Sequence, residues 1–274
     1  MKDSLTHVHE QQAAQAFSRQ SLVFDQIYGA DPIIAYKRRR VRELVLSYLP
    51  GHASIIELNS GTGEDALFFA SQGHRVYATD ISEGMQKQLG EKVAAAGLGH
   101  LVTPELRSFH DLDELPARGP YDLLFSNFGG LNCTNRIGEV LQDAKELVKP
   151  GGLVALVIIP PFCLLEFLLL LKGEWRTATR RLFSRGGSIA RLEGTSFRCW
   201  YHTPRQVRRH LQPEFSLVAL EGLCTFVPPS YREGFAQKRP RLYRFLQRVE
   251  ERLKGRWPWK LVGDYFIIIL KKAP

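Results

Sequence analysis

A glycine-bearing segment near residue 60 constrains the fold of this chain more than any other feature. An apolar strand is predicted over residues 54–58. It leads into the turn Asn59-Ser-Gly-Thr-Gly63, and a helix with an apolar face is predicted over residues 64–72. Glycine adopts backbone angles that other residues avoid, and it lets a ligand approach the main chain closely. The segment therefore predicts the first strand, loop and helix of a nucleotide-binding α/β unit.

An acidic residue follows the next predicted strand. Residues 75–79 form that strand, and Asp80 comes directly after it. In nucleotide-binding units of this kind, an acidic side chain about 20 residues beyond the glycine loop binds the ribose hydroxyls. Asp80 is therefore a candidate for binding the sugar of a nucleotide cofactor.

Four segments resemble, in order and in spacing, the successive motifs of class I S-adenosylmethionine-dependent methyltransferases. They are residues 57–63, 80–81, 121–127 and 148–152. The resemblance implies an enzyme with S-adenosyl-L-methionine as its cofactor. It also implies that Glu57 lies near the amino-acid portion of that cofactor and that Asp80 binds its ribose.

Two residues depart from the family pattern. Asn59 stands where the family usually has its first glycine, and asparagine tolerates the left-handed backbone region better than most residues do. Ser108 stands about where many relatives carry an aspartate near the adenine amino group. The cofactor-binding residues expected from the resemblance are Tyr28, Glu57, Asn59, Gly61, Gly63, Asp80, Ile81, Ser108, Phe109 and Asn127.

Alternation of predicted strands and helices favours an α/β fold. Five strands are predicted at residues 54–58, 75–79, 101–107, 121–126 and 152–159, and three helices at 64–72, 82–96 and 136–148. Residues 215–220 and 265–270 would supply the antiparallel pair that closes the family's sheet. We expect a doubly wound, mostly parallel seven-stranded sheet with helices on both faces.

Residues 1–274 are predicted to form a single methyltransferase domain, and the remaining segments are predicted to be additions to its α/β core. Residues 10–49 read as an N-terminal helical cap, in which Tyr28 either closes the cofactor pocket or packs as an ordinary core tyrosine. Within this cap, Lys37-Arg-Arg-Arg40 is expected to be a solvated helix face. Residues 160–203 and 224–262 are expected to be lid or substrate insertions, before and within the last strand pair.

The acceptor of the methyl group is expected beyond the fourth strand, near the loop at residues 126–132. Phe128, Asn132 and Tyr201 are the candidate substrate-binding residues, with packing in the loop as the alternative for Phe128. His202 is the candidate catalytic base because a histidine titrates in the useful range, although a histidine beside a helix start also serves structural roles. No metal ligands are expected.

Charge is divided unevenly along the chain. Residues 1–171 hold 15 Lys/Arg and 20 Asp/Glu, whereas residues 172–274 hold 22 and 8. The basic part is expected to meet an anionic partner or to form a solvated basic surface. A basic amphipathic helix near residues 239–253 is typical of either bilayer contact or docking on the domain.

An apolar run over residues 153–171 has about the length that spans a bilayer. Pro160 and Pro161 interrupt it, and proline breaks a continuous helix, so it is not predicted to be a transmembrane helix. Its second half is predicted to be a lid over an apolar acceptor, a membrane-surface element or a dimer contact.

Compartment and function class follow from the remaining features. The four cysteines are scattered without zinc-site or disulfide spacing, and the N-terminus lacks an apolar signal core, so a cytoplasmic, possibly membrane-associated protein is expected. The favoured function is methylation of oxygen or nitrogen on a small, partly apolar molecule. One alternative is an RNA methyltransferase that uses the basic C-terminal half, although residues 127–130 lack the proline-containing tetrad typical of enzymes that methylate nucleobase amines. The other is a non-catalytic partner or membrane-surface protein with the same fold.

Overall fold

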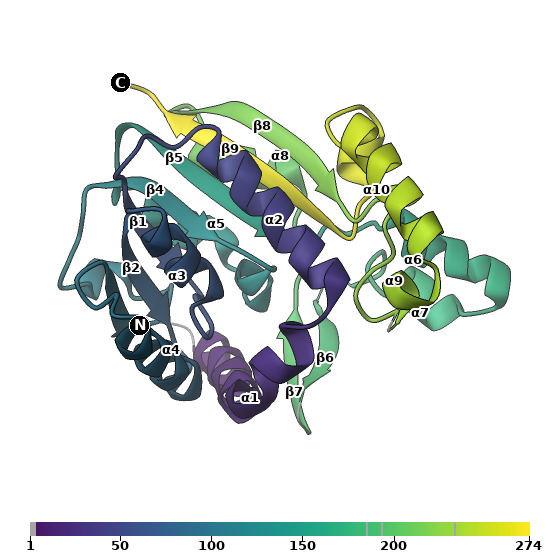
Figure 1. Ribbon diagram of the computed structural model, residues 1–274, viewed down its shortest axis with the longest axis horizontal. Coiled ribbons are helices and arrows are strands. Elements are labelled where there is room, and N and C mark those ends of the chain that lie inside the picture. Colours follow the sequence, from purple (N-terminus) through teal and green to yellow (C-terminus); the bar gives the residue numbers. More distant parts are fainter. Residues whose placement is uncertain (1–3, 185, 193, 233) are drawn as a thin grey trace.

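The computed structural model describes residues 4–184, 186–192, 194–232 and 234–274. A seven-stranded sheet forms its centre, with the strand order β3-β2-β1-β4-β5-β9-β8 (Figure 1). The strands are β1 Ser54–Leu58, β2 Arg75–Asp80, β3 Val102–Leu106, β4 Tyr121–Ser126, β5 Val148–Ile158, β8 Phe215–Leu223 and β9 Tyr265–Lys272. The first five strands run parallel to one another, and β9 lies antiparallel between β5 and β8. The predicted doubly wound, mostly parallel sheet is confirmed.

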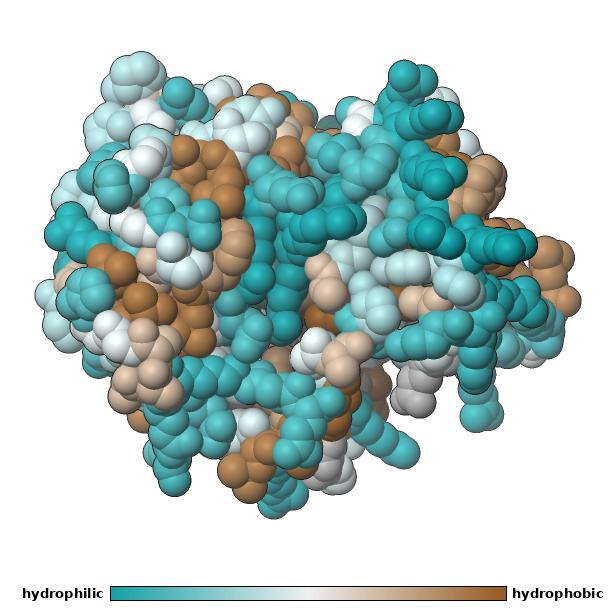
Figure 2. Space-filling view, in the orientation of Figure 1, coloured by the Kyte–Doolittle hydropathy of each residue, from teal (hydrophilic) through white to brown (hydrophobic). Residues whose placement is uncertain are grey.

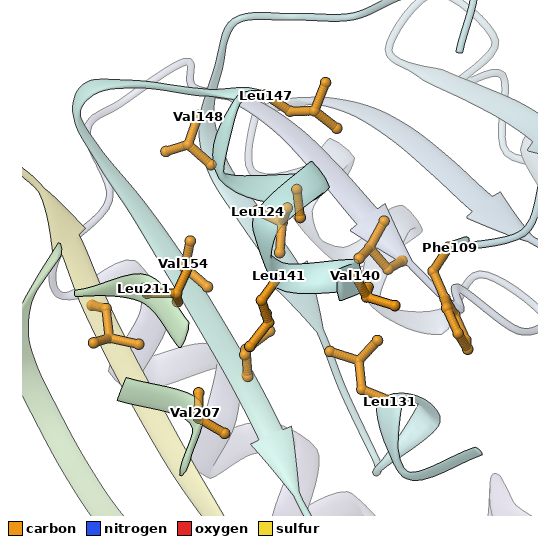
Figure 3. Packing of buried hydrophobic residues seen from close by; sticks show 14 of the residues in the cluster. Phe109, Leu124, Leu131, Val140, Leu141, Leu147, Val148, Val154, Val207 and Leu211 are labelled. Carbon is orange, nitrogen blue, oxygen red and sulfur yellow. The ribbon is translucent and has the colours of Figure 1, made fainter. Parts of the chain in front are cut away.

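Helices cover both faces of this sheet, because its central strands are apolar on both sides. Ile55 of β1 packs toward α2, α3 and α4, while its neighbour Ile56 packs toward α5 and α8. These helices are α2 Pro32–Leu46, α3 Glu64–Ser71, α4 Glu83–Ala95, α5 Ile137–Lys145 and α8 Pro204–Leu211. Figure 3 shows the apolar cluster on the face of Ile56, in which side chains of α5 and α8 meet those of β4 and β5.

The N-terminal segment forms two helices with different positions. α1, Ser4–Tyr28, lies across the end of the sheet beside α4 and the hairpin of β6 Ser188–Leu192 and β7 Thr195–Cys199 (Figure 1). Asp31 caps the start of α2, and its carboxylate accepts hydrogen bonds from the amides of Ile33 and Ile34. A side-chain oxygen at this position satisfies amides that the helix leaves free.

The basic run at the centre of α2 is not the solvated face that the sequence predicts. Arg39 is exposed, but Lys37, Arg38 and Arg40 are buried. Lys37 donates to Asp264 at 3.0 Å, and Arg40 donates to Glu221 at 2.8 Å. The prediction is wrong because acidic residues more than 180 positions away along the chain neutralise Lys37 and Arg40, and Arg38 lies 3.6 Å from Glu64.

The helices of two insertions lie together at the right of Figure 1, whereas the β6–β7 hairpin of the first insertion lies beside α1. The first contains α6 Leu164–Phe167, the 3₁₀ helix η3 Leu168–Lys172, α7 Trp175–Thr179 and the β6–β7 hairpin. The second contains α9 Phe235–Lys238, α10 Pro240–Leu253 and the 3₁₀ helix η4 Trp259–Leu261. Residues 153–171 are divided between β5, α6 and η3, as their prolines predict. Among the described residues, no helix is both long and apolar enough to cross a bilayer.

Candidate active site

A cavity opens at the carboxyl ends of β1, β2 and β4, with α1 as its roof. It encloses about 870 Å³, including its opening toward solvent. The predicted cofactor residues that line it are Glu57, Asn59, Gly61, Asp80, Ile81, Phe109 and Asn127.

The glycine loop between β1 and α3 adopts the backbone conformation that its sequence predicts. Asn59, Gly61 and Gly63 have φ angles of 51°, 56° and 82°, all in the left-handed region. A side chain at Gly63 would place its Cβ 2.0 Å from Leu89 Cδ1 of α4, whereas a Cβ at Gly61 would enter open space. Gly63 therefore allows close packing of the loop on α4, and Gly61 leaves backbone open toward the cavity.

The structure explains how Asn59 is accommodated where relatives carry glycine. Its side-chain oxygen accepts a hydrogen bond from the Ser126 hydroxyl at 2.8 Å, and its amide nitrogen donates to the Asn127 carbonyl at 3.2 Å. A Cβ at Gly130 would lie 2.1 Å from Asn59 Cγ. The absence of a side chain at Gly130 thus makes room for Asn59, which joins the loops after β1 and β4.

Asp80 is held rigidly at the end of β2. Its carboxylate accepts hydrogen bonds from the backbone amides of Gly61 at 2.9 Å and Ser82 at 2.8 Å. Burial raises the pKa of Asp80, and the backbone hydrogen bonds partly oppose that shift. A carboxylate has about four acceptor positions, so Asp80 retains capacity to accept from a ligand hydroxyl.

Glu57 carries the clearest sign that the cavity receives a ligand. It is buried, and within the described part of the chain its Oε2 atom has no hydrogen-bond partner. Burial raises the pKa of Glu57 well above its usual value, and the nearby Asp65 carboxylate raises it further. An unpaired buried carboxylate oxygen is costly, and a cationic ligand group such as an ammonium would satisfy it.

Arg38 of α2 brings a cation to the same cavity. Its guanidinium lies 5.5 Å from the ring centre of Phe128 and 3.6 Å from a Glu64 carboxylate oxygen. Its Nε atom is buried without a hydrogen-bond partner among the described residues. The cavity therefore offers an unpaired carboxylate oxygen on Glu57 and an unpaired guanidinium nitrogen on Arg38, a pair that suits an amino acid group.

The roof of the cavity is mainly apolar. Ala13, Phe17 and Phe24 of α1 line it. Glu10, also on α1, lines the cavity and accepts a hydrogen bond from the Ser108 hydroxyl. A carboxylate from α1 therefore lies at the position where the resemblance implies an aspartate and this chain has Ser108.

Asn127 and Phe128 line the cavity at the end of β4. The Asn127 amide nitrogen donates to Asp65 at 2.8 Å, and its oxygen accepts from the Phe128 amide at 2.7 Å. Phe128 has a left-handed φ of 49°, a conformation that is strained for a bulky residue. The loop thus aims the Phe128 ring at the cavity and Arg38.

Six predicted site residues lie outside this lining: Tyr28, Gly63, Ser108, Asn132, Tyr201 and His202. Tyr28 packs against Phe24, and its hydroxyl accepts from Gln20 at 3.2 Å. Asn132 donates to the carbonyls of Ile159 and Trp200, and it thereby joins β5 to the segment after β7. Tyr201 hydrogen-bonds with Ser188.

The candidate base His202 is buried, and its Nε2 atom lies 3.2 Å from the Thr134 carbonyl oxygen, to which it donates. Burial lowers the pKa of His202 to about 4. The ring is therefore neutral at physiological pH, and its Nε2 atom is engaged outside the cavity lining, an arrangement that fits a structural role.

The cavity-lining residues that sequence reasoning missed include Glu10, Phe17, Phe24, Arg38 and Met85. The cap at 10–49 was expected to cover the site, but its apolar spacing does not identify which side chains point inward. The run of four basic residues could have pointed to Arg38. A charged run beside apolar positions on a helix is partly buried when acidic side chains lie close enough to pair with it. The lining contains no described residue of the insertions 160–203 and 224–262.

No cluster of three or more His, Cys, Asp or Glu side chains that could hold a metal ion occurs in the described ranges. For an S-adenosyl nucleoside, the fit is good. Glu57 offers an unpaired acceptor, Gly61 offers open backbone, and Asp80 stands at the end of β2. The fold and cavity are those of a nucleoside-cofactor-binding α/β protein.

Comparisons with known proteins agree with a fold and cavity that bind a nucleoside cofactor. Residues 55–152 match a family described as a methyltransferase domain. The malonyl-[acyl-carrier protein] O-methyltransferase of Pseudescherichia vulneris is 28% identical over 178 residues, which are 64% of this chain and 62% of that protein. The biotin biosynthesis bifunctional protein BioHC of Cellvibrio japonicus is 27% identical over 178 residues, 62% of this chain and 31% of that protein. The chain thus spans less than two thirds of both relatives.

A solved structure shares the fold over nearly the whole length. The 1,6-didemethyltoxoflavin-N1-methyltransferase of Burkholderia thailandensis, bound to S-adenosylhomocysteine, has a TM-score of 0.60 at 14% identity and covers 100% of this chain and 93% of its own. The motifs, the family match and the fold agree. Residues 55–152 therefore form a class I S-adenosylmethionine-dependent methyltransferase domain, and the cofactor of that class is S-adenosyl-L-methionine.

Proposed function

We propose that this enzyme methylates an oxygen or nitrogen atom of a small, partly apolar molecule. The observation that carries the proposal is the lining of the cavity, where buried carboxylates on β1 and β2 face an apolar roof on α1. Such a cavity suits a charged cofactor on one side and an apolar acceptor on the other. The name of the Pseudescherichia vulneris relative, an O-methyltransferase, supports oxygen as one of the two acceptor atoms.

Different residues of the cavity hold different parts of the cofactor. Glu57 and Arg38 hold its ammonium and carboxylate, Asp80 holds the ribose, and Phe109 and Met85 flank the adenine. When bound, S-adenosylmethionine supplies a methyl group that is already activated for transfer. The chain's task is then to align the acceptor and to exclude water.

Phe128, Phe17 and Phe24 are the proposed walls of the acceptor site. Their rings line the cavity without offering hydrogen bonds, so an acceptor binds there through its apolar part. Burial of aromatic surface also removes water from the reacting atoms. Asn132, Tyr201 and His202 support these walls from outside, through the loops after β4 and β7.

A labelling experiment tests the reaction. The protein is incubated with S-adenosylmethionine carrying an isotopically labelled methyl group and with fractionated cell extract, and products are detected by mass spectrometry. We expect a labelled small molecule that partitions into organic solvent. Label in RNA alone would support the nucleic-acid alternative. Binding of S-adenosylhomocysteine without any labelled product would support a non-catalytic protein.

The variant Asp80→Ala tests the ribose assignment. It is expected to weaken binding of S-adenosylhomocysteine at least about tenfold, because hydrogen bonds to a charged group contribute roughly 1.5–3 kcal/mol. Isothermal titration calorimetry measures the effect. Asp113→Ala, at an exposed carboxylate outside the cavity lining, is the control, and equal affinities for the two variants would refute the assignment.

A further inference from the structure

Large apolar side chains are exposed on the first insertion. Leu171, Trp175 and Phe183 have exposed fractions of 85%, 66% and 83%, and Phe167, Leu168 and Leu182 are also exposed. All six lie between α6 and the segment after α7. Leu171 is followed by Lys172, and Trp175 by Arg176, so cations alternate with the apolar groups. Isolated exposed apolar residues are ordinary, but a group of six in one short segment indicates an interaction site.

Helix α10 of the second insertion presents a row of arginines. Arg241, Arg244, Arg248 and Arg252 are exposed and recur at helical spacing on one face. Leu242 and Phe245, the latter 56% exposed, lie among them. In the described part of the chain, none of the four arginines forms an ion pair. Their charge is therefore available to an external anion.

A groove joins the two insertions. Leu165, Leu168 and Leu169 form one wall, and Pro229, Tyr231 and Phe235 form the other. Four cationic residues also line it: Lys172, Arg232, Lys238 and Arg239. We call this groove, the exposed apolar residues of the first insertion and the α10 arginines the docking face. In Figure 2 this end of the molecule shows hydrophobic groups at its right edge among hydrophilic residues.

We propose that the docking face binds the surface of a bilayer that contains anionic lipids. The apolar side chains enter the boundary between headgroups and acyl chains, and the arginines contact lipid phosphates. Lysine and arginine near an anionic surface and apolar groups that penetrate it act together in peripheral membrane binding. The groove has the chemistry for one lipid, with an apolar interior for the acyl chain and cations for the headgroup.

Two comparisons favour a lipid surface over nucleic acid and over a second copy of this chain. Nucleic acid would pair with the arginines but would leave the aliphatic Leu168, Leu171 and Leu182 in water. A second copy of this chain would cover the apolar groups but would bring unpaired arginines of like charge together. Only an anionic amphiphilic surface satisfies both sets of side chains.

Vesicle sedimentation tests the proposal with the full chain. Vesicles of phosphatidylcholine alone are compared with vesicles that also contain phosphatidylglycerol. The triple variant Leu171→Ser/Trp175→Ser/Phe183→Ser removes apolar groups, and the quadruple variant of Arg241, Arg244, Arg248 and Arg252 to Gln removes charge. All seven residues are exposed, so both variants are expected to fold.

Matched controls are Leu22→Ser, at a residue 74% exposed on α1, and the double variant of the exposed Arg205 and Arg209 to Gln on α8.

The wild-type protein is expected to sediment with the anionic vesicles, and salt is expected to weaken that binding. Each multiple variant is expected to lose at least about tenfold in partitioning, while both controls and S-adenosylhomocysteine affinity stay unchanged. Equal sedimentation with neutral vesicles, or equal losses in the controls, would overturn the proposal. So would RNA binding that only the arginine variant loses while its vesicle binding persists, or a dimer in light scattering that the apolar variant abolishes.

Discussion

Replacement of Glu57 by Gln is expected to weaken binding of S-adenosylhomocysteine by about a hundredfold, because removing one partner of a buried charge pair costs roughly 2–5 kcal/mol. Gln has the same shape but cannot provide the charged oxygen that is unpaired in the cavity. Calorimetry at neutral pH measures the loss. Glu91→Gln, at an exposed residue of α4, is the control, and unchanged affinity in Glu57→Gln would place the ammonium elsewhere.

The same variant separates binding from stability through its pH dependence. Burial raises the pKa of Glu57 in the folded protein above that in the unfolded chain. The carboxyl group therefore contributes stability at low pH that is lost as pH rises through the folded-state pKa. Without ligand, Glu57→Gln should be at least as stable as the wild type at neutral pH, whereas a variant that merely misfolds would be less stable.

Ligand binding reverses the preference of Glu57 for its proton. An ammonium beside the carboxylate favours the ionised form, so binding below the raised pKa releases a proton. Wild-type affinity should therefore increase as pH rises through the pKa of free Glu57 and then level off. Glu57→Gln should lack this dependence, which titrations across the pH range would detect.

Replacement of Arg40 by Met is expected to lower the free energy of unfolding by roughly 3–5 kcal/mol, because it removes the cation beside the buried Glu250 carboxylate. Arg40 is 1% exposed and pairs with Glu221 at 2.8 Å and with Glu251 at 3.1 Å. It also lies 3.7 Å from Glu250, which is fully buried. Urea denaturation measures the change.

Arg39→Met provides the matched comparison on the same helix. The Arg39 side chain is 58% exposed, and its partner Glu43 lies on the same helix, so the expected change stays within about 0.5 kcal/mol. Similar destabilisation by the two variants would contradict a specific role for the buried pairs of Arg40.

The sheet and its glycine loop could be predicted from the sequence because their signals are local. Ile55 and Ile56 read as a buried strand, and the left-handed conformation of Asn59, Gly61 and Gly63 follows from residue type. The position of Asp80 beside that loop follows from the parallel pairing of β1 with β2. These features depend on residues close together in the chain or on the standard geometry of a βαβ unit.

The roof and the buried charges could not be predicted because they depend on distant contacts. Lys37 is solvated or buried according to whether Asp264, 227 positions away, reaches it. Whether Glu10 points at Ser108 depends on how α1 crosses the sheet, which its own residues do not encode. His202 illustrates the same limit, because its burial against Thr134 removes it from the site that its position in the chain suggested.

The contacts that attach α1 to the rest of the domain have a consequence for the cavity beneath it. The helix is tied to the rest of the domain by separate contacts along its length: Ser18 with Ser82, Asp25 with Thr62 and Lys92, and Phe17 with Phe197 of the β6–β7 hairpin. These contacts hold α1 over the cavity. The β6–β7 hairpin, which contributes no residue to the cavity lining, therefore helps to keep the roof in place.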